Sequence, residues 1–182
     1  ALRMGYSLPF YLVIGWLAVR DRLRRGEALP GPRLVVRAAL VGLLGYWFAS
    51  YTDFLGLEYI SAQFERLILF TYPLFVVIFG ALFFRQRISL RALAAVGVSY
   101  AGLAVIFTEK LTEIGNDAVL GAGFVLAGAI SFAFYQLLAH DTIRTMGPRL
   151  FTCIAMTAAA GGAFVQFLLT HPAADLAVSP RV

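Results

Sequence analysis

The residues in this chain with the clearest chemical potential are an acid and a base, Glu65 and Arg66, which stand directly before a long apolar run. Residues 67–84 form 18 positions without a charged side chain, and Pro73 lies among them. At helical rise this run extends about 27 Å, close to the ~30 Å hydrocarbon core of a bilayer. An ionisable group at membrane depth is a candidate functional residue, because burying a charge in lipid is costly.

Two roles are open for Glu65 and Arg66. If the hydrocarbon begins at residue 67, both side chains lie at the outer interface and anchor the helix. If it begins at Ile60, Arg66 lies about 9 Å below the surface and needs a partner, as a substrate-binding or gating residue would. Neighbouring helical residues point about 100° apart, so we do not expect the two side chains to pair with each other.

Pro73 interrupts the hydrogen bonding of the same run. It lacks an N–H group and crowds the carbonyl group of Leu69, which in lipid must find a partner in protein or in a water-filled cavity. One interpretation is a tolerated kink. The other is a hinge or break that lines a path, next to Thr71 and Tyr72.

Aromatic residues gather in the outer half of the preceding apolar run, at Tyr46, Trp47 and Tyr51. Tyrosine and tryptophan concentrate at membrane interfaces, so an aromatic belt is one interpretation and stacking on a substrate is the other.

Polar residues also occur deep in a later apolar run, at Ser131, Tyr135 and Gln136. Ser131 and Tyr135 are four positions apart and share a helix face. They are candidates either for hydrogen bonds between helices or for the lining of a cavity.

The composition identifies a membrane protein. Hydrophobic residues make up 60% of the 182 residues and charged residues only 14%, whereas a soluble domain is about a quarter charged. The net charge of +5 comes from short basic blocks between apolar runs, which argues against nucleic acid as a partner. Cys153 is the only cysteine, and His140 and His171 have no companion ligands, so we expect no disulfide, metal site or cofactor.

The predicted fold class is all-α, a polytopic membrane helix bundle. Its six expected membrane-spanning helices cover residues 4–19, 34–52, 60–84, 92–108, 119–139 and 150–170. Small residues four positions apart, at 97 and 101, 129 and 133, and 158 and 162, indicate faces where helices touch.

The loops between these helices differ in charge. Ten arginines lie in the loops at 20–33, 85–91 and 139–149. One lysine and one arginine lie in the segments at 53–59, 108–118 and 171–182. Because basic loops stay on the cytoplasmic side, we expect a multi-pass protein of the cell inner membrane with the three arginine-rich loops in the cytoplasm.

Residues 42–107 resemble the EamA-type repeat of the drug/metabolite transporter superfamily. The matching motifs are GLEYISA at 56–62, YPLF at 72–75, and the glycines Gly97 and Gly102. At the inner end RQR stands at 85–87 where the family has Gly-Glu-Arg. The SFAFYQ stretch at 131–136 resembles the opening of a second repeat.

The resemblance implies ten helices in two inverted five-helix repeats. Residues 1–112 would then hold most of the first repeat, as helices two to five, and residues 113–182 the start of the second, as helices six and seven. On this interpretation the 182 residues alone do not form a complete translocation path, and one further span precedes them and three follow.

The implied function is secondary transport by alternating access, with export of small organic metabolites such as amino acids or amphipathic amines. Glu65 and Arg66 would bind polar ends of the substrate or gate the outer face, and the aromatic residues would hold its apolar part. The sequence offers no cluster of paired carboxylates or histidines for catalysis, so we predict no enzyme. The alternative is a non-transporting membrane assembly or channel-like subunit, for which the small-residue faces would serve equally well. The expected partners are the lipid bilayer and a small metabolite, and a homodimer is a possible assembly.

Overall fold

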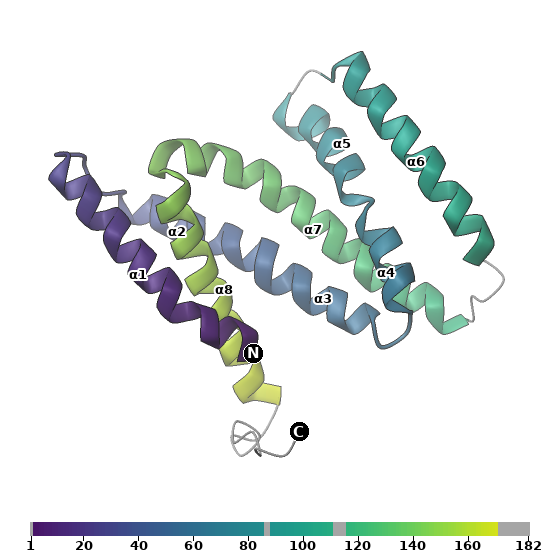
Figure 1. Cartoon of the computed structure of the whole chain (residues 1–182), viewed down its shortest axis with the longest axis horizontal. Helices are drawn as coiled ribbons and strands as arrows, with labels where there is room; N and C mark the ends of the chain where they lie inside the picture. The colour runs from purple at the N-terminus through teal and green to yellow at the C-terminus, as the bar shows by residue number, and fades with distance from the viewer. Residues whose placement is uncertain (1, 86–87, 111–115, 171–182) are drawn as a thin grey trace. The chain divides into compact units, whose positions relative to one another are not determined.

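The chain is a series of α-helices joined by short connections (Figure 1). The computed structural model describes residues 2–85, 88–110 and 116–170, and no strand occurs among them. The elements in chain order are α1 (Leu2–Arg24), α2 (Pro32–Gly42), the π-helix η1 (Leu43–Phe48), α3 (Ala49–Gly56), α4 (Ala62–Leu69), α5 (Tyr72–Phe84), α6 (Leu90–Lys110), α7 (Asn116–Met146) and α8 (Pro148–Thr170).

The structure confirms an all-α, multi-pass membrane protein. Four helical stretches are long and apolar enough to cross a bilayer, namely Pro32–Gly56, Ala62–Phe84, Ala118–Met146 and Pro148–Thr170. A shorter apolar stretch, Leu93–Gly102, lies within α6. The first predicted span, at 4–19, lies within α1. The predicted repeat boundary between residues 112 and 113 lies outside the described residues, as do Gln86, His171 and the tail after it.

The predicted loop at 139–149 is wrong over most of its length. Helix α7 continues to Met146, and Gly147 alone separates it from α8. The helix continues because Thr142 and Met146 are almost fully buried there, so packing holds a segment that looks polar in sequence. Gly147 ends the helix at a φ of +82°, and its N–H donates to the carbonyl of Ile143 at 2.8 Å. This is the left-handed C-terminal position that glycine favours.

The predicted loop at 20–33 is also shorter than expected. Helix α1 runs on through Arg24, and Pro32 begins the next helix, where its missing N–H costs nothing.

One compact unit contains α1, α2 and α8, with the last residues of α7. Helix α8 packs against both α1 and α2 through small side chains. A Cβ atom on Gly42 would come within 2.4 Å of the Ala155 backbone, so α2 and α8 approach as closely as small residues allow. The buried face of α8 includes Ala155 and Ala159. The sequence predicted the neighbouring positions 158 and 162 as the contact face instead.

The other compact unit runs from Leu44 to Asp141 and contains α3, α4, α5 and α6 with most of η1 and α7. Its core cluster joins α4 to α7 through Phe64, Ile68 and Val125, with Ile60 from the preceding turn. Ala129 and Ala133, predicted as a contact face, are fully buried. All the residues that the sequence singles out as site candidates lie in this unit.

Candidate functional site

The long apolar helix around Pro73 is broken. Helix α4 ends at Leu69 and α5 begins at Tyr72, so Pro73 stands in the first turn of α5. A proline in this position has no helical hydrogen bond to lose, and its fixed φ suits the start of a helix. The helix is interrupted at Phe70 and Thr71, and the role of Pro73 as a hinge stays a prediction.

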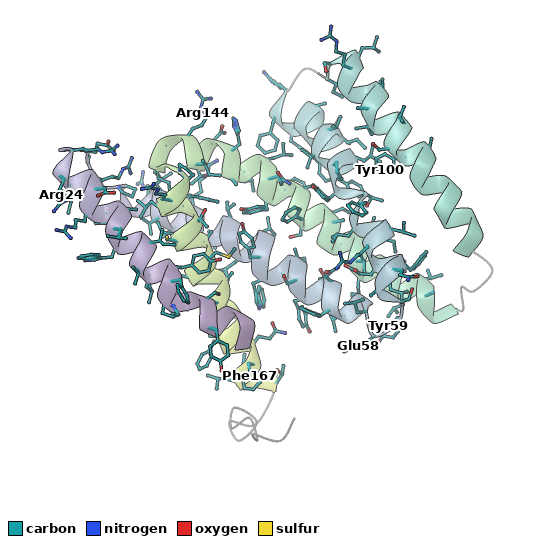
Figure 2. The ribbon with its side chains drawn as sticks, in the orientation of Figure 1. Arg24, Glu58, Tyr59, Tyr100, Arg144 and Phe167 are labelled. Carbon is teal, nitrogen blue, oxygen red and sulfur yellow. The ribbon has the colours of Figure 1, made fainter. Side chains whose placement is uncertain are left out.

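Hydroxyl groups satisfy the backbone at the break. Thr71 donates its Oγ1 hydroxyl to the carbonyl of Ile68 at 2.6 Å. Tyr100, labelled in Figure 2, donates its hydroxyl from α6 to the carbonyl of Phe70 at 2.9 Å. The Ile68 carbonyl also accepts from the N–H of Thr71 at 2.9 Å. The Tyr100 hydroxyl therefore matters more, because an unpaired Phe70 carbonyl in lipid would be costly.

A second irregular segment, the π-helix η1, lies mostly in the same compact unit. The π-helix η1 places Tyr46 beside Tyr135 of α7, with the two hydroxyl oxygens 2.8 Å apart and the ring centroids 5.0 Å apart. Ser131, one turn before Tyr135, donates its hydroxyl to the carbonyl of Leu44 at 2.8 Å. The predicted shared face of Ser131 and Tyr135 is confirmed, and both residues make hydrogen bonds between helices. Single π-helical turns occur frequently at functional sites.

Glycine is required at the centre of this contact. A Cβ atom on Gly45 would lie 2.2 Å from Cγ of Tyr135, so the tyrosine ring rests directly on the η1 backbone.

Aromatic rings connect η1 to the broken helix. Tyr135 stacks on Phe132 at a centroid distance of 5.5 Å, and Phe132 meets Tyr72 edge to face at 5.1 Å. We name Tyr46, Tyr135, Phe132 and Tyr72 the aromatic row. It ends at the first residue of α5, next to the break. Aromatic faces attract both apolar groups and cations, which suits an amphipathic ligand.

Two carboxyl groups meet near the start of α4. Asp53 in the last turn of α3 and Glu65 in α4 are in hydrogen-bonding contact through their side chains. Glu65 is only 6% exposed, and Oδ1 of Asp53 is buried with no hydrogen-bond donor in reach among the described residues. We name Asp53 and Glu65 the carboxyl pair. The charge of Arg66, whose side chain is exposed, acts on both groups.

The sequence correctly predicts that the side chains of Glu65 and Arg66 point in different directions, but it does not indicate that Glu65 contacts Asp53. Glu65 points inward and Arg66 outward, as their angle on a helix requires. The sequence predicts that Asp53 begins the loop at 53–59, whereas α3 extends through Asp53 to Gly56. Its distance of twelve positions from Glu65 carries no signal in the sequence, because only the α3–α4 turn brings the two together.

The remaining predicted site residues lie outside the aromatic row and the carboxyl pair. Trp47 and Tyr51 stack on each other, with centroids 6.3 Å apart and planes 7° apart, and Tyr51 is 38% exposed. Gln136 is exposed on a different face of α7 from Ser131 and Tyr135. Within the described ranges, no group of three His, Cys, Asp or Glu side chains could hold a metal ion.

The unit of α1, α2 and α8 carries a polar cleft that sequence reasoning treated as loop. It lies where α1 ends and α8 begins, and Arg22 donates to Glu27 at 3.0 Å there. Arg149 lies 3.9 Å from the carboxylate of Asp21. These ion pairs are largely exposed, so each contributes little to stability.

Comparison with known proteins agrees with this architecture. The chain is 30% identical over 140 residues to a protein named "Uncharacterized transporter YcbK" of Bacillus subtilis (strain 168), an alignment that covers 77% of this chain and 45% of that protein. It also matches a solved structure titled "Crystal structure of protein" with a TM-score of 0.64 at 20% identity, over 92% of this chain and 57% of that one. The chain thus spans about half the length of these two proteins. Residues 1–108 match the model of the EamA-like transporter family, and the chain belongs to that family.

Proposed function

We propose that the protein is a secondary transporter that exports small organic metabolites, such as amino acids or amphipathic amines, by alternating access. The observation that carries the proposal is the break between α4 and α5, with the aromatic row ending beside it. Broken membrane helices are typical of transporter binding sites, because the interrupted backbone is tolerated only where protein or a cavity covers it. The family and the name of the YcbK relative support the same class.

The aromatic row would hold the apolar part of the substrate. Tyr72 and Phe132 meet edge to face beside the break, and ring faces in this arrangement accept aliphatic or aromatic groups. The exposed Arg66 would meet a substrate carboxylate, for which a guanidinium group offers two parallel N–H donors. An amino acid presents both an apolar side chain and a carboxylate, and an amphipathic amine presents the apolar part alone.

Pro73 would act as the hinge in this mechanism. Alternating access requires segments that change their relative angle while the site stays fixed. The break offers such a point, because hydroxyls of Thr71 and Tyr100 can exchange partners more easily than a continuous helix can open.

The proposed location is the cell inner membrane, with the arginine-rich segments at 20–33, 85–91 and 139–149, each of them partly helical, on the cytoplasmic side. The support is the distribution of arginine. The bilayer and the metabolite would be the partners, with no nucleic acid, and the proposal assigns no catalytic step to any residue.

The test is transport by the full-length protein reconstituted in liposomes. Counterflow of labelled phenylalanine and labelled phenethylamine is measured for the wild type, for Phe132→Ala and for Phe164→Ala. Phe164 lies in α8 and is half exposed, so it is the matched control.

We expect counterflow above that of protein-free liposomes, a KM raised about tenfold by Phe132→Ala, and no change with Phe164→Ala; one stacked ring is worth about 1 kcal/mol beyond its burial. No counterflow of any labelled solute by well-folded protein would favour the non-transporting assembly instead.

A further inference from the structure

The carboxyl pair is an unusual arrangement for two acids in a membrane protein. Glu65 is 6% exposed, and its side chain contacts that of Asp53 rather than a basic partner. A contact between two carboxyl groups is a hydrogen bond only when one of them carries a proton, because ionised carboxylates are acceptors alone. Two ionised carboxylates whose side chains are in contact repel each other strongly.

The surroundings of the carboxyl pair also favour the state in which one of the two groups carries a proton. Asp53 lies in the last turn of α3, where the helix dipole disfavours a negative charge. Its Oδ1 atom is buried without a donor among the described residues. From α7, the side chains packed around α4 are apolar, among them Val125 and Ala122.

The charges acting on the pair are few. Arg66, one position after Glu65, is the basic group that acts on both carboxyls, and each carboxyl acts on the other. A single positive charge can balance one carboxylate but not two. Glu58, in the connection from α3 to α4, is exposed and has no part in the contact.

We propose that Asp53 and Glu65 together bind one exchangeable proton and that this proton is the coupling ion of the transporter. This inference rests on the proposed transport function. When the proton binds, one O–H bond forms and the pair passes from two negative charges to one. When it leaves to the solution on the other side of the membrane, the two carboxylates repel, and the contact between α3 and α4 opens. Proton movement in one direction would thus drive substrate movement in the other.

The first test measures the proton directly and needs no substrate. Infrared spectra of the full-length protein are recorded as a function of pH, and the C=O stretching band of protonated carboxyl groups is followed. Asp53→Asn and Glu65→Gln remove one member of the pair with little change of shape, and Glu58→Gln is the control.

We expect a protonated-carboxyl band in the wild type that persists to neutral pH, that disappears on titration as one proton, and that both pair variants abolish or shift. Glu58→Gln should leave it unchanged. A band identical in the wild type and in Glu65→Gln would overturn the proposal. If Asp53→Asn does not fold, Glu65→Gln decides the result alone.

The second test separates coupling from transport. Proteoliposomes loaded with labelled phenylalanine or phenethylamine are given an imposed pH gradient, a sodium gradient, or none. We expect the pH gradient to accelerate efflux in the wild type and in Glu58→Gln, and Glu65→Gln to lose this acceleration.

Each failure has a different signature. Wild-type counterflow that is indifferent to pH, or that responds to sodium instead, overturns the proton site but leaves the transporter intact. Absence of counterflow in the wild type overturns the transport proposal, whereas the infrared titration still tests proton binding by the pair.

Discussion

At the scale of single residues, the contact of Gly45 with Tyr135 explains why η1 can lie so close to α7. Substitution Gly45→Ala places a Cβ atom 2.2 Å from Cγ of the ring, so either the ring or the backbone must move. We expect a loss of about 1–3 kcal/mol of stability, as for other overpacked sites. The measurement is thermal unfolding of the full-length protein in detergent.

Gly123→Ala is the matched control for this substitution. Gly123 lies in α7 of the same unit, and a Cβ atom there meets nothing within 4 Å. It should be neutral or slightly stabilising, because alanine favours the helix by about 1 kcal/mol over glycine. Equal stability of the two variants would mean that η1 does not rest on Tyr135.

The hydroxyl pair of Tyr46 and Tyr135 gives a second residue-scale prediction. Tyr135→Phe removes one partner of the 2.8 Å contact, and Tyr46→Phe removes the other. Hydrogen bonds between membrane helices are worth about 0.6 kcal/mol on average, so each single variant should lose roughly that amount. The double variant should lose less than the sum, because neither hydroxyl is then left without the other. Strict additivity in a double-mutant cycle of unfolding would rule out a direct bond.

At the scale of elements, Tyr100 is what connects α6 to the broken helix. Tyr100→Phe removes the hydroxyl that caps the carbonyl of Phe70. We expect a loss of about 1–2 kcal/mol of stability, because the Phe70 carbonyl then lacks its donor. Backbone hydrogen exchange should rise at residues 68–75, around the break.

The exposed Tyr6 in α1 provides the control, since Tyr6→Phe touches no such carbonyl. Unchanged exchange at the break would show that other groups satisfy it.

The elements themselves could largely be predicted from the sequence. Helices lie at all six predicted runs, because lipid forces every backbone group in a span to pair internally. Four of these helical stretches are long and apolar enough to cross a bilayer, and the run at 60–84 is divided between α4 and α5. Helix ends were less predictable. Residues 140–146 are polar enough to look like a loop, and only the burial of Thr142 and Met146 makes them helical.

The contacts within the site were less accessible to sequence reasoning. Local spacing placed Ser131 and Tyr135 on one face, but no local pattern indicates that Tyr46 meets Tyr135 or that Asp53 meets Glu65. The sequence also does not indicate which pairs of small residues are buried in helix contacts. Ala129 and Ala133 are fully buried, whereas Gly97 and Ala101 are exposed in the described part of the chain.

At the scale of the whole molecule, the sidedness of the loops is the feature on which the proposed proton-coupled export depends. If the arginine-rich loops are cytoplasmic, the turn between α3 and α4 faces outward, and the carboxyl pair then exchanges its proton first with the outer solution. We therefore expect opposite sidedness for Glu27 and Glu58, which lie at the two ends of one membrane span.

Labelling of single cysteines with a membrane-impermeant maleimide measures this directly. The full-length protein is first freed of its native cysteines, Cys153 included, and then carries Glu27→Cys or Glu58→Cys, both at exposed positions. Glu58→Cys should react in intact cells, and Glu27→Cys only after permeabilisation, because the Pro32–Gly56 span separates the two positions. Reaction of Glu27→Cys and Glu58→Cys from one side would place both ends of the Pro32–Gly56 span on the same face. The carboxyl pair could then no longer be assigned to the outer solution, and the direction of coupling would have to be reversed or abandoned.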